Sequence, residues 1–128
     1  MSVCIPLDPL MALCNPLQDT PWPCGEVRAE RIAQCLAERD YEQAPVPLGA
    51  DADRHAARIA WLIVQGWQDP IAIDVGVPEL GAGVKWPVVD GNHRLGAAIW
   101  RGDTHILAEL SGSIPYLQEL FSLTSCDV

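Results

Sequence analysis

Basic side chains are scarce in this sequence of 128 residues, which holds 8 lysines and arginines against 17 aspartates and glutamates. The net charge of −9 repels a nucleic-acid backbone, so duplex DNA would need a local basic patch. Several arginines instead lie among glutamates in one expected helix, which is typical of a solvated, ion-paired surface. DNA binding is therefore weakly supported, and a nucleotide whose charge Mg2+ offsets suits the chain better.

Long apolar runs are also missing. No segment approaches the roughly 18 apolar residues that a membrane span needs, so no membrane partner is expected. The first eight residues lack a basic side chain and contain proline and aspartate, which makes a poor signal peptide and predicts a cytoplasmic protein. The cysteines form no close pair, and their odd number excludes complete pairing within one chain, so we expect reduced, partly buried thiols. These cysteines are Cys4, Cys14, Cys24, Cys35 and Cys126.

The composition, with 49% hydrophobic and 20% charged residues, is that of a globular protein. Residues 1–24 contain five prolines and many apolar side chains, which predicts an extended arm rather than a helix. Such an arm must pack on the domain or on a partner to hide its apolar surface, which allows a protein partner or self-association there. Residues 3–7 are a candidate edge strand. Residues 25–128 are predicted to form a single domain.

Hydrophobic periodicity and capping signals predict the elements of that domain. We expect helices over 26–39, 51–65, 92–101 and 114–123, and strands over 71–75, 84–89 and 104–110. This order predicts a mixed α+β domain with a small mixed sheet covered by helices. Gly96, Ala97 and Ala98 are small residues that would let the third of these helices approach the sheet closely.

The chemistry of the chain is expected at Asp90-Gly91-Asn92-His93-Arg94, where a strand runs directly into a helix. The first amides of that helix have no partner within it and lie at the positive end of its dipole, which favours an anion. Gly91 permits a positive φ, and Asn92 is a good N-cap. His93 is a candidate general acid or base, while Arg94 has the geometry to hold phosphate oxygens. Asp90 either stabilises the turn or binds Mg2+.

The segment over 70–112 resembles the core of the ParB/sulfiredoxin superfamily. The resemblance rests on a strand at 70–73, a second strand leading into Gly91-x-His93-Arg94, a small-residue helix ending at Gly102, and a closing strand. It implies a ParB/sulfiredoxin-like α+β fold that binds nucleotide phosphates at the residues matching Gly91, His93 and Arg94. Members include ATP-using sulfinic-acid reductases, CTP-dependent partition proteins, free-serine kinases, and plasmid proteins with NTPase or nuclease activity.

The chain departs from several of these members. Sulfiredoxins have cysteine where this sequence has Asn92, so their reaction lacks its nucleophile here. Partition proteins carry a different turn and a downstream DNA-binding domain, for which 128 residues leave no room. Asp90 and Glu109 are candidates by position for a kinase base. The resemblance thus predicts an NTP hydrolase or nuclease of plasmid or phage type, using ATP or another NTP with Mg2+ and the catalytic residues Asp90 and His93. The alternative is a non-catalytic regulatory module that binds a nucleotide or a protein partner.

Three further residues are secondary candidates. His55 either approaches the nucleotide or lies on a solvated helix face, and the neighbouring arginines favour the solvated face. Trp86, beside the basic Lys85, is a candidate for stacking on a nucleotide base. His105 is expected to be structural. The remaining tryptophans that we considered are expected in the core or at an interface. They are Trp61, Trp67 and Trp100.

Overall fold

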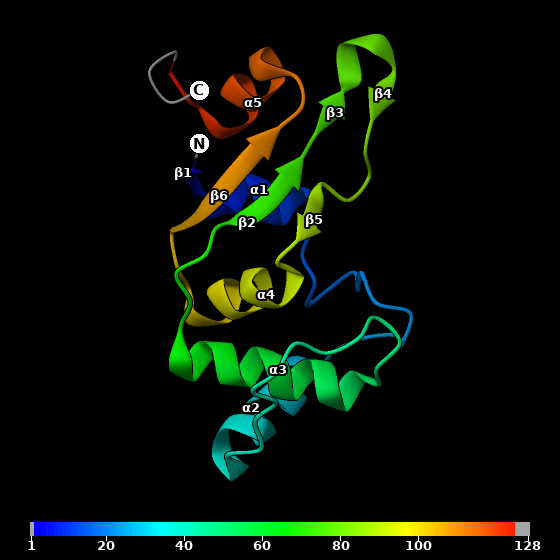
Figure 1. Cartoon of the computed structure of the whole chain (residues 1–128), viewed down its shortest axis with the longest axis vertical. Coiled ribbons are helices and arrows are strands. Elements are labelled where there is room, and N and C mark those ends of the chain that lie inside the picture. The colour runs from blue at the N-terminus through cyan, green and yellow to red at the C-terminus, as the bar shows by residue number, and fades with distance from the viewer. Residues whose placement is uncertain (1, 125–128) are drawn as a thin grey trace. The chain divides into compact units, whose positions relative to one another are not determined.

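The computed structural model describes residues 2–124 and has a mixed α+β architecture, as expected (Figure 1). It divides into two compact units. The first comprises residues up to 14, 69–92 and from 103 onward, and the second comprises residues 15–68 and 93–102. The segment 1–24, predicted to be one arm, thus contributes to both units. None of the described helices has the length and apolarity needed to cross a membrane.

The first unit is built on a four-stranded sheet with the strand order β1-β6-β2-β5. The strands are β1 (Ser2–Pro6), β2 (Ile71–Asp74), β5 (Val88–Asp90) and β6 (His105–Ser111). β2 pairs with β6 in parallel, whereas β1 and β5 join the sheet antiparallel to their neighbours. Alternate residues along the two central strands are buried, which is the pattern of a sheet with one face in the core. The small mixed sheet and the edge strand near the N-terminus are therefore confirmed.

Helices α1 (Leu7–Leu13) and α5 (Ile114–Phe121) belong to the same unit and bury leucine and phenylalanine side chains. The prediction of an arm without helix is wrong over α1. Pro9 is the third residue of this helix, where its missing N–H removes no intrahelical hydrogen bond. A proline breaks a helix only beyond the first turn, where its missing N–H would have donated to the carbonyl four residues earlier.

A small hairpin follows β2 and extends beyond the main sheet (Figure 1). It consists of β3 (Gly76–Val77), the 3-10 turn Pro78–Leu80 and β4 (Ala82–Gly83). The strand predicted over 84–89 is shorter than expected, because pairing in β5 begins only at Val88. Pro87 cannot donate to a neighbouring strand, although its carbonyl accepts a hydrogen bond from the Asp74 amide at 2.9 Å.

The second unit is helical, and α3 lies between α2 and α4 (Figure 1). Its helices are α2 (Ala29–Glu38), α3 (Ala52–Gln65) and α4 (Asn92–Arg101), of which residues 93–101 belong to this unit. The Asp51 carboxylate caps α3 by accepting a hydrogen bond from the Arg54 amide at 2.9 Å, and Gly66 ends the helix. These limits agree with the prediction for this helix.

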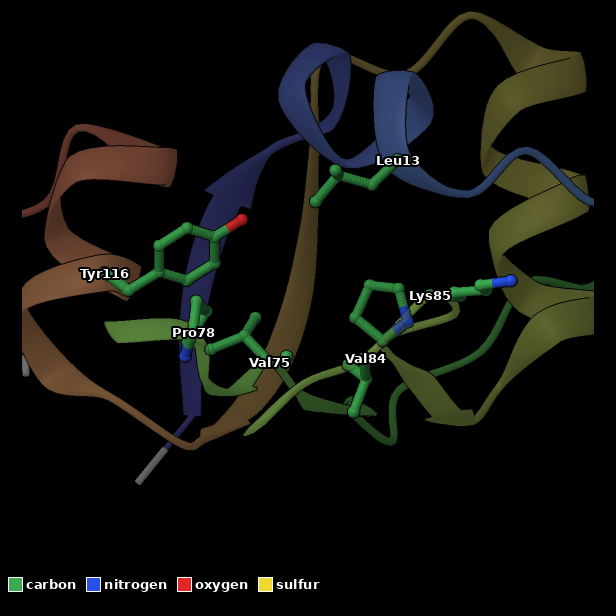
Figure 2. Close-up of a pocket in the computed structure, with 8 residues that line it drawn as sticks. Leu13, Val75, Pro78, Val84, Lys85 and Tyr116 are labelled. Atoms are coloured by element: carbon green, nitrogen blue, oxygen red, sulfur yellow. The ribbon is translucent and has the colours of Figure 1, made fainter. Parts of the chain in front are cut away.

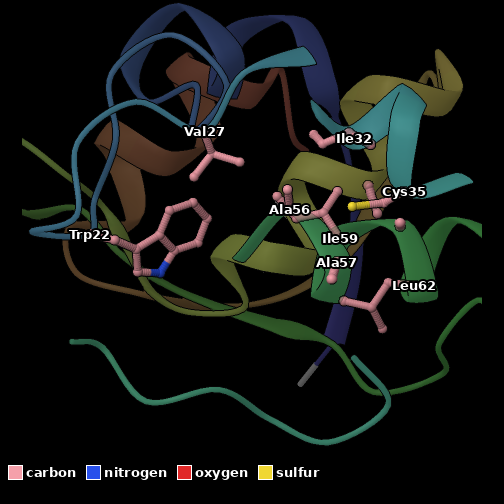
Figure 3. Close-up of a cluster of buried hydrophobic side chains, with 10 residues drawn as sticks. Trp22, Val27, Ile32, Cys35, Ala56, Ala57, Ile59 and Leu62 are labelled. Carbon is pink, nitrogen blue, oxygen red and sulfur yellow. The ribbon is translucent and has the colours of Figure 1, made fainter. Parts of the chain in front are cut away.

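A buried apolar cluster holds these helices together, with Trp22 at one side of it (Figure 3). Ile32 and Cys35 of α2 meet Ile59 of α3 in this cluster. A Cβ atom added at Gly96 would lie 3.2 Å from Cδ1 of Ile59 and 3.6 Å from Cδ2 of Leu17. The small residue at 96 therefore lets α4 approach α3, and our prediction that it serves packing on the sheet is wrong.

Candidate functional site

The strand-to-helix turn has the backbone that the sequence predicts. β5 ends at Asp90, Gly91 has a φ of 106°, and α4 follows at once. A Cβ atom at Gly91 would overlap Cγ2 of Ile71 and lie 3.2 Å from its Cα. Glycine is thus required twice at this position, for its positive φ and for the close packing of the turn on β2.

Asn92 does not act as the predicted N-cap, because α4 already begins at this residue. Its side chain is instead used within the first unit. Oδ1 accepts a hydrogen bond from Nε1 of Trp86 at 2.8 Å, and Nδ2 donates to the Val88 carbonyl at 3.5 Å. This pair of bonds connects Trp86 to the start of α4, so the indole that we considered for base stacking is held by the turn itself.

Asp90 is exposed at the end of β5. No group of three or more histidine, cysteine, aspartate or glutamate residues suited to a metal lies within residues 2–124. Mg2+ is commonly bound in proteins by one or two carboxylates together with the phosphates of its substrate. Asp90 therefore belongs to no such group among these residues, and Mg2+ binding at its carboxylate stays a prediction.

His93 forms a pair with His55. Nε2 of His93 lies 2.8 Å from Nδ1 of His55, and the two rings are inclined by only 15°. Both rings stack on the indole of Trp22, each with a centroid separation of 4.5 Å. His55 is completely buried, so our prediction of a solvated helix face is wrong for this residue. The aromatic face of Trp22 covers two adjacent imidazoles that share a hydrogen bond.

Two arginines of the second unit lie near this histidine pair. Burial lowers the pKa of Arg58, the negative charge of Glu42 raises it in part, and the positive charge of Arg94 lowers it again. Arg58 also donates to the Gln43 carbonyl at 2.7 Å, which holds its side chain in place. Burial lowers the pKa of His93 to about 3, with further contributions from the charges of His55, Arg58 and Arg94. His93 is consequently neutral at physiological pH.

This depressed pKa predicts that the protein loses stability in mild acid. The unfolded chain binds a proton at His93 below a pH of about 6.5, whereas the folded chain does so only near pH 3. Stability is therefore fully present above about pH 6.5 and falls as the pH decreases through this window. Between pH 7 and pH 5 we expect a loss of about 2 kcal/mol from His93. The pKa of His55 is also lowered, chiefly by burial, and acts in the same direction.

Urea unfolding of the wild type and of His93→Gln at these two pH values tests this expectation. The glutamine side chain of this variant can still form a hydrogen bond with His55 but does not titrate. The stability of the variant should therefore change less between pH 7 and pH 5. Equal changes in both proteins would show that His93 is not the group responsible.

The structure thus brings His55, His93 and Arg94 together in the second unit and adds two residues that the sequence analysis missed. Trp22 was passed over because it lies in the proline-rich segment, where no periodicity marks it as buried. Arg58 was noted only as a neighbour of His55, although its position four residues after Arg54 is a helical spacing. Elsewhere, His105 is exposed and its Nδ1 lies 3.0 Å from Oγ1 of Thr104, and Glu109 is exposed on β6.

The prediction of partly buried thiols holds for three of the four described cysteines. Cys14 and Cys35 are buried, Cys24 is half-buried and Cys4 is exposed, and these four are free cysteines. Burial raises the pKa of Cys14 to about 11, which keeps this thiol protonated and unreactive. Cys126 lies outside the described residues.

A cavity of about 250 Å³ lies in the first unit, and Lys85 and Pro87 on either side of Trp86 are among the residues that line it. Figure 2 shows Tyr116, Pro78 and Val75 on one side of it and Val84 and Lys85 on the other. The lining is mostly apolar, and the ammonium group of Lys85 points away from the other side chains.

Comparison with known proteins adds no assignment to this geometry. The chain matches no protein-family model, no curated protein and no solved structure.

Proposed function

We propose that this protein binds the phosphate groups of a nucleoside triphosphate at the first turn of α4. The observation that carries the proposal is the pair of His55 and His93, 2.8 Å apart, at which the positive charges of Arg58 and Arg94 are both felt by a histidine that remains neutral. An anion placed near these two guanidinium groups would offset their positive charge at His93 and gain charge-assisted hydrogen bonds. The backbone amide of His93, in the first turn of a ten-residue helix, supplies a further donor.

The proposed ligand is a nucleotide because of the ParB/sulfiredoxin resemblance. The observed order of β2, β5, Gly91, α4 and β6, with β2 parallel to β6, supports that fold assignment. Nucleotide phosphates carry several negative charges, which on this acidic chain require local cations such as Arg58 and Arg94. Mg2+ bound to the nucleotide would offset part of the remaining charge.

Binding is tested by calorimetric titration of ATP and of CTP in the presence of Mg2+. We expect the wild type to bind at least one of them, and Arg94→Ala to bind it about 10- to 100-fold more weakly. This range corresponds to about 1.5–3 kcal/mol for lost hydrogen bonds to a charged group. Arg28→Ala is the matched control, since Arg28 is an exposed arginine of the same unit whose Nε lies 4.0 Å from Glu26. Its affinity should equal that of the wild type.

Absence of binding for both nucleotides would contradict the proposal. If a nucleotide binds but Arg94→Ala binds it equally well, the phosphate site lies elsewhere. Release of inorganic phosphate by the wild type would identify an NTP hydrolase. Binding without release would favour the regulatory module, in which the same site senses a nucleotide without turnover.

A further inference from the structure

The histidine pair has a geometry that assigns its protons. The imidazoles of His55 and His93 lie edge to edge in nearly one plane, with ring centroids 5.1 Å apart and nitrogens 2.8 Å apart. One of these nitrogens must donate and the other must accept. Trp22 covers both rings from one side, which keeps the two ring planes close to parallel.

The surroundings of His55 decide which nitrogen donates. Its Nδ1 is already paired with His93, so we infer that the backbone carbonyls of Leu48 and Ala50, which raise the pKa of His55 against the effect of burial, lie on the Nε2 side. Neither carbonyl completes a hydrogen bond to Nε2, which is buried and has no hydrogen-bond partner among the described residues. A bare nitrogen there would set its lone pair against the carbonyl lone pairs, so the proton of neutral His55 belongs on Nε2. Nδ1 of His55 is then the acceptor, and Nε2 of His93 is the donor.

We propose that His55 is a positioning residue that keeps His93 in the tautomer with a proton on Nε2 and a lone pair on Nδ1. Through this lone pair, His93 accepts a proton from a water molecule beside the bound phosphate. The water oxygen attacks the terminal phosphorus, its proton passes to Nδ1, and the bond to the bridging oxygen breaks. The electron pair of that bond leaves with the nucleoside diphosphate. This last step rests on the proposed nucleotide site, whereas the tautomer does not.

The charged groups around the histidine pair make the basicity of His93 depend on whether a phosphate is bound. Arg58 of α3 and Arg94 of α4 repel a proton on His93, as does a charged His55. On the other side, Asp51 favours and Arg54 disfavours a proton on His55. A phosphate that neutralises the two guanidinium groups near His93 raises the pKa of this residue. His93 therefore becomes an effective proton acceptor only when an anion is bound, which couples binding to proton uptake.

Nitrogen-15 NMR of the three histidine side chains tests the tautomer directly in the full chain without any ligand. At pH 7.5 we expect Nδ1 of His93 to show the chemical shift of an unprotonated nitrogen and Nε2 that of a protonated one. His55 should show the same tautomer. His105→Gln assigns the exposed third histidine. A proton on Nδ1 of His93 would overturn the proposal, whether or not a nucleotide binds.

Two variants of His55 separate positioning from packing. His55→Phe keeps a ring on Trp22 but has no acceptor, so His93 should show a mixture of both tautomers. His55→Asn offers an amide oxygen near the former Nδ1 and should restore the single tautomer. If His55→Phe leaves the tautomer of His93 unchanged, another group holds it and the proposal fails. The NMR spectrum of the wild type decides the tautomer even if a variant does not fold.

A separate measurement tests whether His93 accepts the proton of the attacking water. Titration with ATP and Mg2+ at pH 6 should move Nδ1 of His93 toward the shift of a protonated nitrogen, with proton uptake in the calorimeter. If the wild type binds ATP without any change at Nδ1, His93 is not the proton acceptor and only the binding proposal stands. If ATP does not bind, the proposed function fails, while the tautomer is still decided by the spectrum without ligand.

Discussion

Trp22→Ala is expected to destabilise the protein by about 3–5 kcal/mol, the largest loss that we predict for a single substitution. Only 6% of this residue is exposed, and its indole contacts both His55 and His93. Removing it leaves a cavity and admits water to the two imidazoles. Chemical unfolding at pH 7 measures the loss.

The same substitution should change the titration of His93. Burial is the largest cause of its depressed pKa, so hydration of the ring returns this pKa from about 3 toward the ordinary value near 6.5. Trp22→Phe is the control, because it keeps an aromatic face over the histidines and should retain most of the depression. An unchanged titration of His93 in Trp22→Ala would show that the indole does not keep water away from the pair.

Gly91→Ala should destabilise the protein by about 3 kcal/mol. Alanine is strained at a φ of 106°, and its Cβ would overlap Ile71 of β2. The overlap includes a distance of 3.2 Å to the backbone Cα of Ile71, so rotation of that side chain does not fully relieve it. Chemical unfolding measures the loss, and we expect nucleotide affinity to fall with it because the turn leading into α4 is displaced.

Gly81→Ala separates the two causes. Gly81 lies in the same unit with a φ of 77°, and a Cβ there would meet no heavy atom within 4 Å. Its substitution should therefore cost only the backbone strain, about 1 kcal/mol. Equal losses at the two glycines would show that contact with Ile71 does not contribute.

Helix limits were predictable where local chemistry determines them. Asp51 and Gly66 bound α3, and their effects act within one turn of chain, through a side-chain cap and a backbone conformation. The same holds for Gly91 and Gly102 around α4, both of which have a positive φ. Capping signals failed only at Asn92, whose side chain finds a partner in Trp86 that helical spacing does not indicate.

Structural features that depend on residues far apart in the sequence were predicted less well. The prolines near the N-terminus suggested an arm, yet Pro9 is accommodated in the first turn of α1. Gly96 indicated close packing of a helix, but only the fold shows that its neighbour is Ile59 of α3. Residue type thus predicted that a close contact occurs, and tertiary structure selected the partner.

The sequence by itself determined the α+β class, the glycine turn at 91 and the helix that begins beside it, because each depends on interactions between neighbouring residues. It also placed His93 and Arg94 in that first turn. Only the tertiary structure brought His55, Arg58 and Trp22 to them, since these residues lie far away along the chain. His55 and Arg58 arrive through the packing of α3 against α4, and Trp22 stacks on the two histidines. The chemistry of His93 depends on that packing, because burial and nearby charges, rather than residue type, decide whether an imidazole carries a proton.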